Sequence, residues 1–263
     1  MPRTHEVYHR YGPNVHILDS VWATSLLTQL CNEQTALPEV RKLAERLYRE
    51  ALLREVIDSG IFPTTPTGVL TPMRSLVAGR AMLKTDTFNP ATQVAIANLL
   101  RAGDVPSATC MDELGPMLLP GKIEMHYFGA SRTTDENHQV NGTAITYKKI
   151  GPLHDRILLL PDPMGATGGT IVQILTEYGD EQLKLVRTIV TMHLIITPEY
   201  IRRVTEAYPQ VQIYALRLDR GMSDTDVLDS VPGTFPDREF GLNEIQYIVP
   251  GAGDLGFRLT GIP

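Results

Sequence analysis

The chain has 263 residues, of which 43% are hydrophobic and 21% are charged, and this composition is ordinary for a protein that buries a substantial core. It excludes disordered and collagen-like chains. Lysine and arginine number 24 against 30 acidic residues, and the resulting formal charge of −6 argues against general nucleic-acid binding.

Residues 16–58 show the helical spacing of apolar side chains, arranged on two stripes. A second helix is expected to begin at Pro38 and Glu39, because proline suits the first helical position. The proline, threonine and glycine content of residues 60–72 predicts a connecting loop. We therefore expect one domain over 1–263 whose N-terminal part, 1–72, is mainly helical. The first stripe comprises Leu18, Val21, Trp22, Leu26 and Leu30.

From residue 94 onward, short apolar runs alternate with helical segments, which predicts a parallel sheet covered on both faces. We expect strands at 123–128, 157–160, 187–195, 211–218 and 245–249. One helix should run from Thr170 to Gly179, and another should begin at Thr197. Residues 131–142 and 221–241 are polar and long, which suggests functional flaps or surface insertions. Residues 73–263 would thus form an α/β core.

No run of 18 apolar residues occurs, and residues 1–10 are polar and charged, so we expect neither a membrane span nor a secretory signal. Two cysteines, Cys31 and Cys110, are too few for a disulfide framework, and we expect both to be buried. These features predict a cytoplasmic location. His126 and His193 fall within apolar runs, where a buried structural role is expected.

The strand at 157–160 leads into an acidic residue and a glycine-rich loop. Glycines let main-chain N–H groups approach an anion, while two threonine hydroxyls and the following helix N-terminus also favour a phosphate. The same glycines would suit a tight turn that binds no ligand, and that alternative stays open here. No lysine follows the glycines, so the loop is not that of a P-loop NTPase. Its sequence is Asp162-Pro163-Met164-Gly165-Ala166-Thr167-Gly168-Gly169-Thr170.

This loop resembles the ribose-phosphate loop of the uracil phosphoribosyltransferases, in which a leucine usually stands at the position of Gly165. Three further motifs match the family in order and spacing. They are Leu99-Leu100-Arg101-Ala102-Gly103, Phe128-Gly129-Ala130-Ser131-Arg132 and Tyr247-Ile248-Val249-Pro250-Gly251-Ala252-Gly253-Asp254. The resemblance implies the type I phosphoribosyltransferase fold, with a mostly parallel central sheet flanked by helices and a C-terminal hood that binds the base. It also makes residues 94–100 a strand.

The activity implied by the resemblance is transfer of ribose 5-phosphate from 5-phosphoribosyl-1-pyrophosphate (PRPP) to uracil, giving UMP and pyrophosphate. Asp162 would face the ribose hydroxyls, Arg101 the pyrophosphate and Asp254 the N1 proton of the base. The implied PRPP-binding residues are Arg101, Arg132, Asp162, Pro163, Met164, Gly165, Ala166, Thr167, Gly168, Gly169 and Thr170. The implied uracil-binding residues are Met164, Tyr247, Ile248, Gly253, Asp254 and Leu255.

Mg²⁺ is expected to accompany the pyrophosphate of PRPP rather than to occupy a protein cage, because Pro163 stands where related enzymes have a second acid. The resemblance also implies a homodimer or larger homo-oligomer, and it allows a GTP effector.

Two departures from the family pattern leave other functions open. Phe257 replaces a usual aspartate near the C-terminus, and Asn98 stands where an apolar residue or proline is usual. The changed residues Ala252, Leu255 and Phe257 would allow a phosphoribosyltransferase for another base, and a catalytically weak nucleotide-binding regulatory protein also stays an alternative. The spacing Gly251-x-Gly253-x-x-Gly256 matches a dinucleotide motif, but only seven residues follow it, so we expect no helix there to receive a pyrophosphate.

Overall fold

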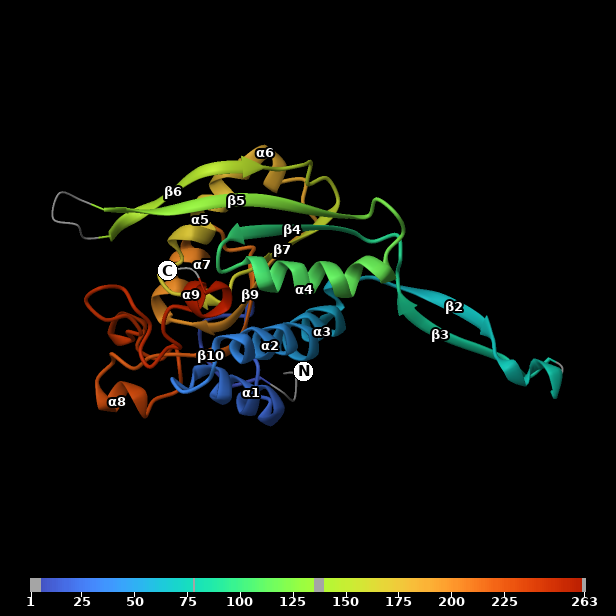
Figure 1. The fold of residues 1–263 in the computed structure, drawn as a ribbon, viewed down its shortest axis with the longest axis horizontal. Helices are drawn as coiled ribbons and strands as arrows, with labels where there is room; N and C mark the ends of the chain where they lie inside the picture. The colour runs from blue at the N-terminus through green and yellow to red at the C-terminus, as the bar shows by residue number, and fades with distance from the viewer. Residues whose placement is uncertain (1–5, 78, 135–139, 262–263) are drawn as a thin grey trace.

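The computed structural model describes the backbone of residues 6–77, 79–134 and 140–261, and their side chains except at 130–134 and 140–143. An eight-stranded sheet forms its centre, and a two-stranded arm extends away from it (Figure 1). The central strands are β1 (Val15–Ile17), β4 (Gln93–Leu100), β5 (Ile123–Thr134), β6 (Val140–Lys149), β7 (Arg156–Pro161), β8 (Met164–Gly165), β9 (Thr188–Ile196) and β10 (Gln212–Leu218). The arm consists of β2 (Thr64–Leu70) and β3 (Met82–Phe88).

The order of the central sheet is β1-β10-β9-β7-β4-β5-β6, with β8 beside β9. Every pairing is parallel except that of β5 with β6. Leu159 of β7 lies opposite Ile96 of β4 and Val190 of β9. The carboxyl ends of these three strands therefore meet at one edge of the sheet, which is where open α/β sheets bind ligands.

Helices cover both faces of the sheet, as the alternation of its side chains requires. Ile157 and Leu159 of β7 point into one apolar core, while Leu158 and Leu160 point into the other. The first core includes side chains of α1–α4 and α9, and the second includes side chains of α5 and α7. The helices are α1 (Val21–Cys31), α2 (Leu37–Leu47), α3 (Leu53–Val56), α4 (Asp104–Leu114), α5 (Gly169–Tyr178), α6 (Asp180–Leu183), α7 (Pro198–Ala207), α8 (Thr225–Leu228) and α9 (Leu255–Thr260).

The structure confirms two predicted helices, α5 and α7, and the strands predicted at 94–100, 123–128, 157–160, 187–195 and 211–218. Helix α5 ends at Gly179, whose φ of +78° favours glycine, and α7 begins after Thr197, whose side chain accepts a hydrogen bond from the Tyr200 N–H. His126 and His193 are buried as expected, and so is Cys110. Cys31 is only half-buried, with its Sγ 3.4 Å from Nη1 of Arg217.

The N-terminal prediction is wrong in two respects. Residues 15–17 form the edge strand β1 instead of the start of a helix, because they pair with β10. On α1, Leu26 and Leu30 are buried, but Val21 and Trp22 are exposed by 84% and 54% of their surface, so the predicted apolar stripe includes two exposed side chains.

The loop predicted at 60–72 is instead half of the arm, since β2 pairs along its whole length with β3. The boundary expected at residue 72 falls between these two strands, and β1 belongs to the central sheet. Residue 72 is therefore not a structural boundary.

The strand predicted at 245–249 is also wrong, because a single bridge from Ile248 to Leu242 is the only ladder contact this described segment makes. The polar segment at 221–241 contains α8 and is held from inside by Glu239. This carboxylate is fully buried, forms an ion pair with Arg220 and accepts hydrogen bonds from the Gly233 N–H and the Tyr11 hydroxyl. No helix of the described residues has the length and apolar character needed to cross a membrane.

Candidate active site

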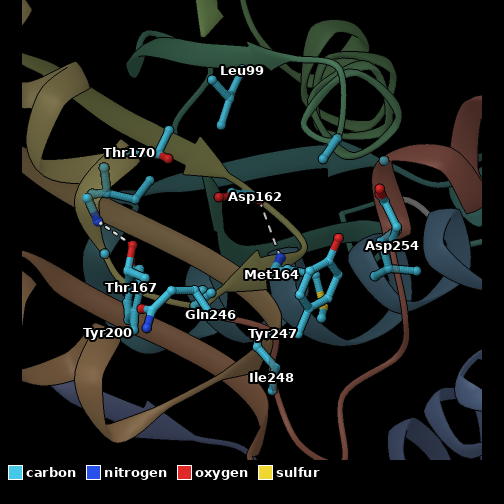
Figure 2. Close-up of a pocket in the computed structure, with 18 of the residues that line it drawn as sticks. Leu99, Asp162, Met164, Thr167, Thr170, Tyr200, Gln246, Tyr247, Ile248 and Asp254 are labelled. Atoms are coloured by element: carbon cyan, nitrogen blue, oxygen red, sulfur yellow. Dashed lines mark hydrogen bonds between the residues drawn. The ribbon is translucent and has the colours of Figure 1, made fainter. Parts of the chain in front are cut away.

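A cavity of about 960 Å³ opens at the carboxyl edge of the central sheet. Figure 2 shows its labelled side chains, which come from the end of β4, the loop after β7 with the start of α5, helix α7 and the C-terminal segment. The lining includes almost all predicted site residues: Arg101, Asp162, Met164, Gly165, Ala166, Thr167, Gly168, Gly169, Thr170, Tyr247, Ile248, Gly253, Asp254 and Leu255. Motifs that are far apart in the sequence thus share one pocket.

The glycine-rich loop (residues 163–169) packs against the strand and helix that follow it. A Cβ atom on Gly165 would lie 2.8 Å from Cγ2 of Ile196 and 2.9 Å from Cδ2 of Tyr200, so only glycine permits this approach. Thr197 fixes the loop from the other side, since its hydroxyl donates to the Ala166 carbonyl and its N–H to the Gly165 carbonyl.

The end of the same loop begins helix α5. Gly168 has a φ of +74°, and the Gly169 N–H donates to Oγ1 of Thr167 (Figure 2). The first residues of α5 line the cavity, and their N–H groups have no partner within the helix, so those beyond Gly169 are potential donors to an anion. Pro163 differs from its neighbours: it is buried and does not line the cavity, and its carbonyl accepts from Leu194 and Ile195. Its expected contact with PRPP is therefore not supported.

Asp162 lies at the end of β7, with 9% of its surface exposed. Burial raises the pKa of its carboxyl group to about 7, although the Met164 N–H, 3.3 Å from Oδ1, favours the ionised form. A carboxyl group with this pKa changes charge near neutral pH, which is typical of functional sites.

A buried hydrogen-bond chain supports Asp162 from below. Burial lowers the pKa of His193 to about 3, so its ring is neutral at physiological pH. The Asp162 carbonyl can only accept, so Nδ1 of His193 carries the proton and Nε2 accepts from the Tyr200 hydroxyl at 2.6 Å. His193 and Tyr200 thus connect the floor of the site to helix α7.

Arg101 follows β4 in a tight turn that ends at the start of α4. The Gly103 N–H donates to the Leu99 carbonyl, and the Asp104 N–H donates to the Arg101 carbonyl. Asn98 is buried, and its amide donates to Oδ1 of Asp104 at 3.0 Å, which gives this departure from the family pattern a structural role. Arg132 lies in β5, paired with Thr143, but its side chain is outside the described residues.

The C-terminal hood is fixed by an ion pair at the end of β10, between half-buried Arg217 and buried Asp219. Arg217 and Asp219 contact each other through Nε and Oδ1 at 2.7 Å. Oδ2 of Asp219 accepts from the Gly251 N–H at 2.8 Å, and Nη2 of Arg217 donates to the Gly251 carbonyl at 3.0 Å. The main chain of the hood is therefore held at Gly251 from both sides.

Contrary to expectation, a short helix does follow the glycines of the hood. Asp254 caps α9, because its Oδ1 accepts from the Phe257 N–H at 3.0 Å, and Leu255 is buried in the first core. Helix α9 has six residues and ends at Gly261, so it is too short for the βαβ unit that a dinucleotide site needs.

Sequence reasoning missed ten cavity residues. Two of them, Tyr200 and Arg203, could have been found from the sequence. Helix α7 was predicted, and residues three apart on a helix share one face. The others extend known motifs or lie in α5 and the C-terminal segment: Leu99, Leu100, Ala102, Ile171, Gln173, Gln246, Pro250 and Gly256.

Comparisons with known proteins agree with this geometry. The sequence profile described as uracil phosphoribosyltransferase matches residues 17–241. The chain is 30% identical over 245 residues to a uracil phosphoribosyltransferase of Pyrobaculum islandicum, covering 93% of this chain and 97% of that protein. It is equally similar, over 252 residues, to the enzyme of Caldanaerobacter subterraneus, covering 94% and 98% of the two chains.

The fold itself resembles a solved protein from Aquifex aeolicus, with a TM-score of 0.69 at 22% identity over 94% of this chain and 98% of that one. The profile match spans most of the sequence, and it includes the glycine-rich loop and the Arg101 turn that meet in the cavity. The chain therefore belongs to the uracil phosphoribosyltransferase family.

Proposed function

We propose that the cavity carries out the reaction of the family, transfer of ribose 5-phosphate from PRPP to N1 of uracil, which gives UMP and pyrophosphate. The observation that carries this proposal is the meeting, in one cavity, of three separate features. These are the glycine-rich loop at the start of α5, Arg101 after β4, and the glycine-bent hood. Each suits one part of the reactants: a phosphate, a pyrophosphate and a flat base.

The 5-phosphate would bind at residues 166–170, where the potential donors are main-chain N–H groups other than those of Ala166 and Gly169, which already donate within the loop, together with the hydroxyls of Thr167 and Thr170. Asp162 lies beside this cradle, in position for the ribose hydroxyls. Breaking the bond to pyrophosphate builds positive charge on the ribose ring, and an ionised Asp162 stabilises that charge in a largely desolvated place. Holding donor and base together also removes most of the entropic cost of their encounter.

Arg101 would pair with the pyrophosphate leaving group, for which a guanidinium offers several donors in one plane. Among the described residues, no three His, Cys, Asp or Glu side chains form a cluster that could cage a metal ion. We infer that a Mg²⁺ ion arrives with the pyrophosphate, and Asp162 is an acidic residue of the cavity floor. When bound, Mg²⁺ would neutralise charge on the leaving group.

The base would lie against the hood, where Tyr247 and Met164 offer flat and polarizable surfaces. Main-chain groups around Gly253 and Leu255 would read its edge. Asp254 uses Oδ1 to cap α9, and its other oxygen would orient or accept the N1 proton. A base edge with one donor and acceptor exchanged leaves a buried polar group unpaired. The value of kcat/KM for uracil should therefore exceed that for cytosine about tenfold to a hundredfold.

Incubation of the purified chain with labelled uracil, PRPP and Mg²⁺, scored for UMP, tests the proposal. The matched controls omit PRPP or use Asp162→Asn. Competition by cytosine, 5-fluorouracil and orotate measures base choice: a better substrate among them would favour a phosphoribosyltransferase for another base. Tight UMP binding without turnover would favour a regulatory protein.

The arm favours the homo-oligomer that the resemblance implies. Seven large apolar residues on and beside β2 and β3 are exposed, and an isolated two-stranded sheet is only marginally stable in water. Burial against a second copy would remove them from water. They are Val69, Leu70, Met73, Leu76, Val77, Met82 and Leu83. Control by GTP and a cytoplasmic location stay predictions.

A further inference from the structure

Helix α7 packs directly against the backbone of the glycine-rich loop. A Cβ atom on Gly168 would lie 3.1 Å from Cγ2 of Val204 and 3.3 Å from Cβ of Arg203. A Cβ atom on Gly169 would lie 3.2 Å from Nη1 of Arg203. Glycine at these two positions therefore lets an arginine head group reach the first turn of α5.

The head group of Arg203 is available for a ligand. Arg203 is exposed and lines the cavity beside Thr167. Within the part of the chain that the structure describes, no ion pair or hydrogen bond occupies its guanidinium. The acid one turn before it, Glu199, is already engaged, since its carboxylate accepts from the N–H groups of Gly241 and Leu242. The next turn carries Glu206, also at the surface.

A phosphate bound at the loop would also need a positively charged side chain nearby to balance its charge. The chain is acidic overall, and residues 163–169 contain no basic side chain to balance a phosphate dianion. The helix N-terminus contributes only about half an elementary charge. Arg101 also lines the cavity, but it follows β4, whereas the glycine-rich loop follows the neighbouring strand β7. A guanidinium beside Gly169 would add a full charge and several donors where the dianion would lie.

We propose that Arg203 is a ligand for the 5-phosphate of the sugar, in addition to the main-chain N–H groups of the loop. The inference rests on the proposed function, because it names a further residue of the same phosphate site. It is a binding role: the phosphate keeps its charge and position throughout the reaction, so Arg203 should affect ligand affinity far more than kcat.

The test compares Arg203→Gln with wild type by calorimetric titration with ribose 5-phosphate and, separately, with pyrophosphate. The matched control is Arg202→Gln, which removes the same charge from the same helix but from a residue outside the main cavity, whose head group donates to the Pro236 carbonyl. We expect Arg203→Gln to weaken ribose 5-phosphate about tenfold, since a charged hydrogen bond is lost at a partly exposed place. Pyrophosphate affinity should change less than about twofold, and Arg203→Lys should recover part of the loss.

Three results would overturn the inference: unchanged affinity of Arg203→Gln for ribose 5-phosphate, equal weakening of both ligands, or the same loss in Arg202→Gln. The last two would show a general effect of surface charge. Because the titration needs no uracil, it separates this inference from the proposed function. A protein that binds ribose 5-phosphate through Arg203 yet forms no UMP would overturn the proposed function alone.

Discussion

Replacing Asp162 with asparagine should stabilise the fold and impair the reaction, and both effects follow from its burial. Folding raises the pKa of this carboxyl group from about 4 to about 7. Between these values the folded protein retains a proton that the unfolded chain releases. The contribution of Asp162 to the free energy of unfolding must therefore fall as pH rises from about 4 to about 7, and then level off.

The pKa difference corresponds to at most about 4 kcal/mol, and water entering the open cavity would reduce it. An asparagine side chain cannot ionise, so Asp162→Asn escapes this penalty while still accepting from the Met164 N–H. The stability of this variant relative to wild type should rise between pH 4 and pH 8 by up to about 4 kcal/mol. Other groups, including neutral His193, titrate in both proteins and cancel in the difference.

Urea denaturation of both proteins at several pH values between 4 and 8 measures this difference. The exposed Asp229→Asn serves as the control for loss of one negative charge without burial. In the activity assay, Asp162→Asn should lower kcat by about tenfold to a thousandfold, because the charge it stabilises exists only as the bond breaks. A stability difference that does not vary with pH would refute the raised pKa, and an unchanged kcat would remove Asp162 from the site.

Three other changes probe the surrounding structure. Gly165→Ala places a methyl group 2.9 Å from the Tyr200 ring and should cost about 1–3 kcal/mol in urea denaturation; a cost that does not shrink in a Tyr200→Ala background would contradict this contact. Asp219→Ala removes the acceptor of the Gly251 N–H, so steady-state kinetics should show KM for uracil rising more than KM for PRPP; an equal rise in both would argue against a role confined to the hood. Arg101→Ala should weaken the binding of PRPP, measured by calorimetry, far more than the binding of UMP, which has no leaving group. Equal weakening of the two affinities would make Arg101 structural.

The parts of the site that could be predicted from sequence are those built by neighbours along the chain. The loop from Asp162 to Thr170 contains its own donors, its own glycines and the start of its own helix. It can therefore be recognised from the amino-acid sequence alone. The same is true of the Thr197 cap of α7, which bonds a main-chain N–H three residues away. Local chemistry of this kind depends little on the rest of the fold.

The errors arose where a distant partner decides the conformation. Residues 15–17 form a strand only because β10, far along the chain, pairs with them, and β2 needs β3 across the tip of the arm. Residues 245–249 are apolar enough for a strand, but among the described residues they find a single bridge at Ile248. Strand formation depends on such pairing, so periodicity alone cannot decide it.

The sequence by itself determined the family motifs, the succession of buried strands and helices, and the residues of the glycine-rich loop, because each rests on contacts within a few residues. Only the tertiary structure decided what surrounds that loop. It brought Arg203 against Gly169, placed His193 and Tyr200 beneath Asp162, and closed the Arg217–Asp219 pair on Gly251. These contacts join elements whose separation in sequence carries no local signal, and they exist because parallel strands bring their carboxyl ends to one edge.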